Sequence, residues 1–252
     1  MNWHQLLSAA LDIGEQMLVS GGEIYRVEDC INRICRAYGA IDVDVFTITS
    51  SIVLTIQAPD GKRYTQTRRI ERSETNLDRV DKLNLLSRQM CSEPIGYQEF
   101  SSRFDRIMMQ PRYPRWLEYL AYAMIAGCFT AFSGGSLLDA VISLLIGLVL
   151  RMVVKMNGDL QFNRVLSSVI ASFVISALAF AAAGFLDGVS VDTVVIGNIM
   201  LLIPGVALTN SMRDMISGDT MSGSLRFIEA CIVALAIAAG YMLAGSVLGG
   251  VL

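Results

Sequence analysis

Residues 165–186 read VLSSVIASFVISALAFAAAGFL, which is 22 consecutive residues without a charged side chain. A helix needs about 20 apolar residues to cross the hydrocarbon core of a bilayer. Four similar stretches lie beyond residue 116, so we predict five membrane spans, at approximately 117–133, 137–154, 165–186, 193–210 and 227–247. The alternative, buried helices of a large soluble protein, would need amphipathic partners that this chain does not supply.

The charged residues are divided unequally along the 252-residue chain. Hydrophobic residues make up 53% and charged residues 17%, and the mean hydropathy is +0.51. Soluble domains are usually about 45–50% apolar and about 25% charged. Residues 1–116 contain 15 of the 20 basic and 15 of the 23 acidic residues, which leaves 5 and 8 for the rest of the chain. We therefore expect a soluble first half and a membrane-embedded second half.

The composition argues against several classes of function. A net charge of -3 and a pI near 5.2 provide no basic surface for a nucleic acid. The five cysteines are odd in number and contain no Cys-x-x-Cys pair, and His4 is the only histidine. These counts exclude a histidine-rich metal site and a Ser-His-Asp or Cys-His catalytic group, and they do not indicate a disulfide framework. We expect no catalytic residue, no metal, no other cofactor and no signal peptide, and hence a protein that is not an enzyme.

The few basic residues near the predicted spans indicate an orientation. They precede the first span and lie around the connections between spans two and three and between spans four and five. They are Arg112, Arg115, Arg151, Lys155, Arg164, Arg213 and Arg226. Because basic residues are retained on the cytoplasmic side of a membrane, we predict a cytoplasmic N-terminus and place residues 249–252 outside.

The fourth predicted span contains the most informative polar residues. Pro204 lacks an amide proton, so the helix should kink or break there, and Gly205 eases the distortion. Asn198 precedes the break, and Asn210 and Asp214 follow it. Broken helices near the middle of the membrane hold small substrates in many transporters. A proline kink that packs against a neighbouring helix explains this stretch equally well.

Other polar and small residues of the spans have a structural interpretation. Glu229 follows Arg226 by three residues at the cytoplasmic edge of the fifth span, where the pair can anchor the helix. Small residues recur at every fourth position in the third and fifth spans: Ser168, Ser172 and Ser176, and Ala236, Gly240 and Ala244. Close helix packing is favoured over pore lining for these two faces.

The first half has the pattern of a small α+β domain. Apolar residues at helical spacing predict helices over 3–19, 23–38, 76–92 and 97–109. Alternating residues predict three short strands in a meander, with Ile41, Val43 and Val45 on one side of the first. The predicted fold is an α-helical membrane protein: residues 1–112 form a cytoplasmic α+β domain with a linker helix, and residues 113–252 form the five-span transmembrane domain.

Charged residues crowd the beginning of the second predicted helix: Glu23, Arg26, Glu28, Asp29 and Arg33. Acidic residues favour the positive end of a helix dipole, so solvated capping and ion pairing is the main interpretation. A membrane enzyme that uses Arg26, Glu28 and Asp29 for acid–base chemistry is a weaker alternative, because no paired carboxylates, nucleophile elbow or phosphate loop accompanies them.

Three stretches resemble the threonine/serine exporter (ThrE-like) family. The first contains Gly14, Gly21, Arg26-Val27-Glu28, Arg33 and Gly39. The second is Tyr113-Pro114-Arg115-Trp116. The third and most specific contains Leu202-Ile203-Pro204-Gly205, Asn210, Asp214, Gly218, Gly223, Arg226 and Glu229. The chain departs from the family pattern at Gly22-Glu23, where small residues are usual, and its layout is similar to the larger, YjjP-type subunit of the two-chain form.

The resemblance implies export of small hydrophilic metabolites, threonine and serine or a dicarboxylate such as succinate, across the inner membrane of a bacterium and coupled to protons. On this hypothesis the substrate contacts are Asn198, Pro204, Gly205 and Asn210. Asp214, and secondarily Glu229, would carry the coupling proton. Arg26, Glu28 and Arg33 belong to the family motif of the cytoplasmic domain, which would gate entry or sense substrate.

The odd number of predicted spans indicates a missing partner. Alternating access usually rocks one repeat against an equivalent one, and five spans cannot be divided in that way. We therefore expect a second small membrane subunit, of the YjjB type in this family, or a homo-oligomer. The main alternative function is a membrane-anchored module whose soluble domain senses a ligand or regulates another protein.

Overall fold

The structure is a computed structural model that describes residues 1–110 and 113–248. The chain divides into two compact units: unit 1 comprises Met1–Pro111 and Gly205–Ile228, and unit 2 comprises Arg112–Pro204 and Glu229–Leu252. Arg112 and residues 249–252, which the predicted orientation uses, lie outside the described residues.

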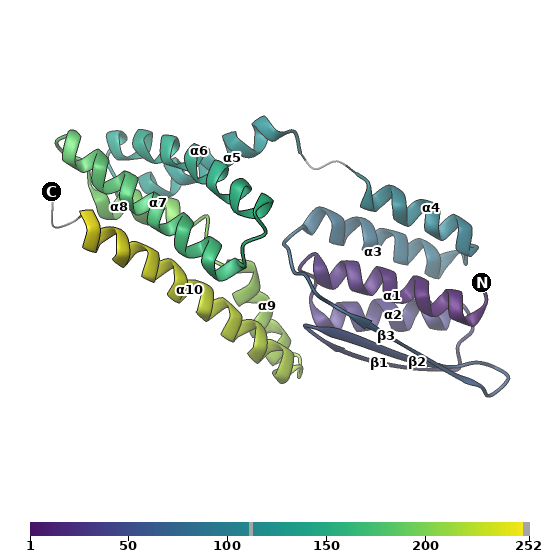
Figure 1. Ribbon diagram of the computed structural model, residues 1–252. Helices are drawn as coiled ribbons and strands as arrows, with labels where there is room; N and C mark the ends of the chain where they lie inside the picture. Colours follow the sequence, from purple (N-terminus) through teal and green to yellow (C-terminus); the bar gives the residue numbers. More distant parts are fainter. Residues whose placement is uncertain (111–112, 249–252) are drawn as a thin grey trace. The chain divides into compact units, whose positions relative to one another are not determined.

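Unit 1 contains a three-stranded sheet covered on one face by helices (Figure 1). Its elements are α1 (Trp3–Val19), α2 (Ile24–Ala37), β1 (Asp42–Ile48), β2 (Ser51–Gln57), β3 (Arg63–Arg69), α3 (Leu77–Ser92), α4 (Tyr97–Met108) and α9 (Gly205–Ile216). The strands are antiparallel in the order β1-β2-β3. The four helices and the meander predicted for the first half are confirmed.

Local sequence explains these elements. The Asn2 side chain accepts the Gln5 N–H at 2.8 Å while the Gln5 side chain accepts the Asn2 N–H, and this capping box begins α1. The alternating residues of β2 place Ile52, Leu54 and Ile56 in the core beneath the helices. The expectation for Ile41 is wrong: it is 60% exposed, because β1 begins only at Asp42 and Ile41 belongs to the connection from α2.

Unit 2 is helical. It contains α5 (Arg115–Phe132), α6 (Leu137–Asp159), α7 (Arg164–Phe185) and α8 (Val191–Ile199), together with the second part of α10 (Thr220–Leu248), a helix that begins in unit 1. The close packing predicted for the small-residue faces is confirmed at Ser172, whose hydroxyl donates to the Ile237 carbonyl at 2.7 Å. Gly240 of α10 lies against Val169 and Phe173 of α7.

The prediction of five spans is wrong. Among the described residues, three helices are long and apolar enough to cross a membrane: Leu137–Asp159, Arg164–Phe185 and Thr220–Leu248. The first predicted span became α5, which has only 18 residues and carries Arg115 and Glu118 in its first turn. The fourth became two helices, α8 of 9 and α9 of 12 residues. Both are far shorter than the roughly 20 residues that a span requires.

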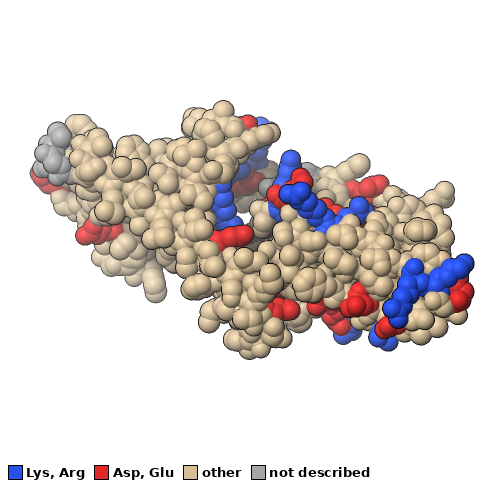
Figure 2. All heavy atoms as spheres, turned by 60° about the horizontal axis from the view of Figure 1, so that its bottom comes forward, with Lys and Arg blue, Asp and Glu red and all other residues tan. Residues whose placement is uncertain are grey.

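The distribution of charge follows the two units. Figure 2 shows the Lys, Arg, Asp and Glu side chains gathered mainly over the strands and helices of unit 1. The visible surface of unit 2 consists largely of other residues. Large side chains such as Leu145, Met152 and Leu235 are exposed there, at 61%, 61% and 70%. Apolar exposure on this scale is expected of helices that face lipid.

Candidate functional site

The connection between α1 and α2 is a tight turn, which we call the Gly21–Glu23 turn. Gly21 has φ +92°, a conformation that side chains with a Cβ rarely adopt. The Gly22 N–H donates to the Met17 carbonyl at 2.8 Å, and a Cβ on Gly22 would lie 2.8 Å from that same oxygen. Glycine is therefore required at both positions, as the backbone folds back on the end of α1.

A helical hairpin faces this turn within unit 1. It is formed by α9 and the first part of α10, and we call it the α9–α10 hairpin. Asp219 closes the connection by donating its N–H to the Asp214 carbonyl at 2.9 Å. The helices are close at Gly223, where a Cβ would lie 2.7 Å from the Ser211 carbonyl oxygen.

Polar side chains of the hairpin bind the backbone of the turn. Asn210 donates from Nδ2 to the Gly21 carbonyl at 2.9 Å, and Arg226 donates from Nη2 to the Gly22 carbonyl at 3.0 Å. Arg213 pairs with the carboxylate of Glu23, which is buried. The turn and the hairpin are thus joined through residues about 190 positions apart in the sequence.

Asp214 is the central acidic group among the residues that join the turn to the hairpin, which we call the cluster. It is fully buried, and its Oδ2 lies 3.3 Å from Nη1 of Arg226, whose side chain is 12% exposed. Its Oδ1 accepts the N–H of Ile24, the first residue of α2, at 3.3 Å. The Glu23 side chain makes no capping hydrogen bond, so the Asp214 carboxylate accepts the hydrogen bond at the N-terminus of α2 and adds a negative charge there. Burial raises the pKa of the Asp214 carboxyl, while the Arg226 charge opposes that increase.

The three motif residues of α2 have different surroundings. Arg26 pairs with Glu23 at 2.9 Å and therefore lies beside the turn. Glu28 accepts the Thr47 N–H at 2.8 Å, which attaches α2 to β1, and burial raises the pKa of Glu28. Arg33 pairs with Asp29 at 2.8 Å on the exposed face of the helix and is not part of the cluster.

The break predicted at Pro204 is confirmed. Helix α8 ends at Ile199 and α9 begins at Gly205. The carbonyl groups of residues 200–203 accept no backbone hydrogen bond from the described part of the chain. Unsatisfied carbonyl groups at a helix end are available to a ligand or to water.

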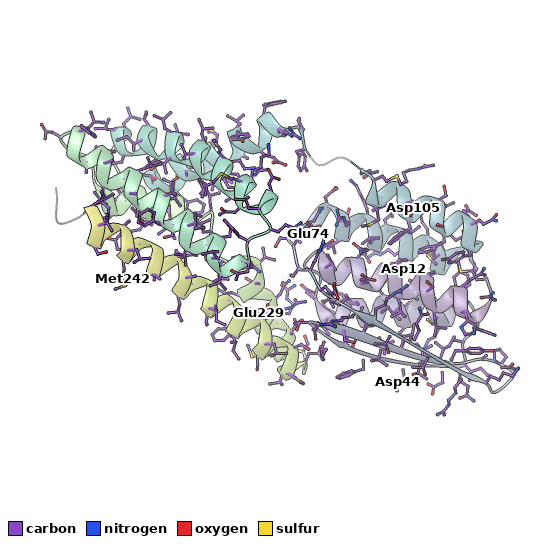
Figure 3. All side chains as sticks on the ribbon, in the orientation of Figure 1. Asp12, Asp44, Glu74, Asp105, Glu229 and Met242 are labelled. Carbon is purple, nitrogen blue, oxygen red and sulfur yellow. The ribbon has the colours of Figure 1, made fainter. Side chains whose placement is uncertain are left out.

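The two remaining candidates, Asn198 and Glu229, belong to unit 2. Asn198 is fully buried in α8, and its Nδ2 donates to the Val194 carbonyl at 2.9 Å. Its Oδ1 accepts no hydrogen bond from any residue in the described ranges. Glu229 lies exposed on α10 (Figure 3). Of the predicted residues, the structure brings Asn210, Asp214 and Arg26 together around one turn.

Sequence reasoning did not identify the roles of Gly22, Glu23, Arg213 and Arg226 in this cluster. The departure from the family pattern at Gly22-Glu23 was the available signal, because the structure pairs Glu23 with Arg213. Spacing along the chain gives no indication that residues 21–24 and 210–226 are in contact.

A family model described as "Putative threonine/serine exporter" matches residues 8–248, which is nearly the whole chain. The chain belongs to the threonine/serine exporter family. The family resemblance noted in the motifs is therefore confirmed, and the match includes both the Gly21–Glu23 turn and the α9–α10 hairpin.

Named relatives fall into a short and a long form. "Probable succinate transporter subunit YjjP" of Escherichia coli (strain K12) is 27% identical over 95% of this chain and 93% of that protein. The protein of the same name from Klebsiella aerogenes is 26% identical over 92% of this chain and 90% of that protein. "Probable threonine/serine exporter" of Mycobacterium tuberculosis is 25% identical over 96% of this chain but only 46% of its own length. No solved structure matches the chain.

Proposed function

We propose that this chain is a membrane subunit of an exporter of small hydrophilic metabolites in the inner membrane of a bacterium. Family membership and the names of the bacterial relatives support export of threonine and serine or of a dicarboxylate such as succinate. Three helices long enough to span a bilayer support a membrane location. The positive-inside rule supports a cytoplasmic N-terminus and an external C-terminus.

The observation that carries a mechanism is the buried Asp214–Arg226 pair beneath the Gly21–Glu23 turn. Burial raises the pKa of Asp214, which brings its protonation closer to physiological pH. A proton on Asp214 removes the charge that faces Arg226 and weakens the acceptor for the Ile24 N–H. Burial outweighs these two effects, because the pKa is raised and the buried arrangement therefore holds the proton more tightly than an exposed carboxyl would. Loss of the proton from Asp214 would loosen the turn from the hairpin, and the cytoplasmic domain would act as a gate.

Substrate contact is proposed at the break between α8 and α9. The carbonyl groups of residues 200–203, which accept no backbone hydrogen bond from the described residues, can accept hydrogen bonds from an ammonium or hydroxyl group of the substrate. Pro204 and Gly205 maintain this break, and the unpartnered Oδ1 of Asn198 is a further acceptor within unit 2. Asn210, in unit 1, is a further candidate for substrate contact. Glu229, which is exposed, is a second candidate for the residue that carries the coupling proton.

A second membrane subunit, of the YjjB type, or a second copy of the chain would complete the transporter. The word "subunit" in the names of the two short relatives supports a partner of some kind. The M. tuberculosis relative, of which this chain matches less than half, leaves room for such a partner in one polypeptide.

The test is efflux from proteoliposomes that contain the full chain with and without the candidate partner. Radiolabelled threonine, serine and succinate are loaded, and a pH gradient is imposed. We expect proton-driven efflux of at least one substrate, and a decrease of at least tenfold in D214N. The matched control is D105N, because Asp105 is an exposed carboxylate on α4 (Figure 3).

The variant P204A tests the break separately. It should insert into membranes normally and lose efflux. In a continuous helix the carbonyl groups of residues 200–203 would accept helical hydrogen bonds and would no longer be available to a substrate. Proton-driven efflux by D214N within twofold of the wild type would contradict the coupling role. Substrate binding without efflux in every preparation would favour the ligand-sensing module instead.

A further inference from the structure

A basic cavity lies at the open end of the α5–α6 hairpin in unit 2. Helices α5 and α6 are joined by residues 133–136, so the beginning of α5 meets the end of α6. The cavity has a volume of about 300 Å³. It is lined by Tyr113, Arg115, Glu118, Tyr119, Arg151 and Lys155.

Arg151 is held in place at the wall of this cavity. Its Nε donates to Oε2 of Glu118 at 3.0 Å, and its Nη2 contacts the same oxygen. The guanidinium also lies over the rings of Tyr119 and Tyr122, at 5.9 and 5.6 Å from their centroids. Glu118 is thereby neutralised, and the direction of the guanidinium is fixed.

Two further cations have no such partner. Arg115 and Lys155 are exposed, and neither forms an ion pair with another residue that the structure describes. Three cations and one carboxylate give the lining a formal charge of +2. Tyr113 and Tyr119 add phenol hydroxyl groups, which can donate hydrogen bonds to an anion. The cavity therefore presents two uncompensated cations and neutral donors to one small volume.

The level of the cavity along the helices indicates the source of the anion. Arg151 and Lys155 lie in the last turns of α6, one of the three candidate spans. Arg115 and Trp116 lie at the beginning of α5 and Tyr113 lies just before it, and Trp116 is 66% exposed. Exposed aromatic residues and cations at the end of a span are typical of the lipid headgroup level. Basic pockets between membrane helices at this level bind phosphate headgroups.

We propose that this cavity is a binding site for a phosphate group, supplied by the headgroup of an anionic phospholipid. Arg115 and Lys155 bind the phosphate oxygens, Arg151 presents a fixed guanidinium, and the tyrosine hydroxyl groups donate hydrogen bonds. The lining of the cavity shares no residue with the Asp214–Arg226 pair or with the α8–α9 break, so the proposal does not depend on the proposed export mechanism.

The experiment is a titration of the purified full chain in a neutral detergent, followed by native mass spectrometry. The probes are short-chain phosphatidylglycerol, short-chain phosphatidylcholine and inorganic phosphate. We expect the wild type to bind phosphatidylglycerol in preference to phosphatidylcholine. Since each cation near a headgroup contributes about a fivefold factor, R115Q/K155Q should bind phosphatidylglycerol about 25-fold more weakly.

Two variants keep the test specific. R115K/K155R retains both charges and should bind within a fewfold of the wild type. R164Q removes an exposed cation at the beginning of α7 that does not line the cavity, and it should bind normally. Melting temperatures of all variants should agree within a few degrees, because the substituted residues are exposed.

The outcomes separate the sources of the anion. Binding of inorganic phosphate with the same dependence on Arg115 and Lys155 would support the site with a soluble phosphate as its ligand. Equal binding of phosphatidylglycerol by the wild type and R115Q/K155Q would overturn the proposal, as would an equal loss in R164Q. Succinate that displaces either phosphate compound at equal concentration would also overturn it.

Discussion

Asp214 shows how much can depend on one residue. Its carboxylate is fully buried, and its partners are the Arg226 guanidinium and the N–H of Ile24. Removal of one member of a buried ion pair is costly because the other charge is left without compensation. D214A should therefore lower the free energy of unfolding by about 3 kcal/mol, measured by denaturation of the purified protein in detergent.

Two variants show whether this loss arises from the pair. D105A removes an exposed carboxylate of α4 and should change stability by less than about 0.5 kcal/mol. D214A/R226M removes both charges and should recover part of the loss. Equal destabilisation by D105A and D214A would show that the pair has no special role.

Asp214 should also make stability depend on pH. Burial raises its pKa in the folded protein above the ordinary value of 3.8, so the folded state holds the proton more tightly than the unfolded chain does. The associated stability is fully present below about pH 3.8 and is lost as the pH rises through the folded-state pKa. D214N lacks this dependence, so its stability relative to the wild type should increase as the pH rises. A difference that does not change with pH would contradict the raised pKa.

Two buried thiols provide a separate test of the core of unit 1. Burial raises the pKa of Cys30 to about 11 and that of Cys35 to about 12. Only the thiolate reacts with alkylating agents, so both should react very slowly at pH 8 in the folded protein. Mass spectrometry of peptides after timed alkylation should show labelling of both only when denaturant is added. Rapid labelling without denaturant would show that α2 opens readily.

Among the elements, the Gly21–Glu23 turn is the most constrained. A Cβ on Gly22 would lie 2.8 Å from the Met17 carbonyl oxygen, whereas a Cβ on Gly96 would meet nothing within 4 Å. G22A should therefore destabilise the protein by about 1–3 kcal/mol, and G96A should be tolerated. Thermal denaturation of the two variants checks the difference, and equal melting temperatures would contradict it.

Elements governed by local pattern could be predicted from the sequence, and those governed by distant contacts could not. The helical spacing of Leu6, Ala10 and Ile13 and the alternation through β2 are local signals, and both elements formed where expected. The break at Pro204 follows from one missing N–H. The capping of α2 by Asp214 depends on tertiary contact, and no spacing rule predicts it.

For the whole molecule, hydropathy predicted a membrane protein correctly but gave too many spans. An apolar stretch of 18 residues was counted as one span at 193–210, although Pro204 divides it into two short helices. The second of these helices, together with the beginning of α10, belongs to the same compact unit as the sheet. The predicted division at residue 112 stays a prediction, and the family model covers both sides of it.

The capping of α2 by Asp214 sets an order of events during synthesis. Ile24 is synthesised 190 residues before Asp214, whose carboxylate accepts its N–H. At about 5–20 residues per second, roughly 10 to 40 s separate the two. During that interval α2 has no negative charge from Asp214 at its N-terminus, and the carbonyl groups of the turn have no partners on α9 and α10. Unit 1 is therefore completed only after helices α6 and α7 have been synthesised.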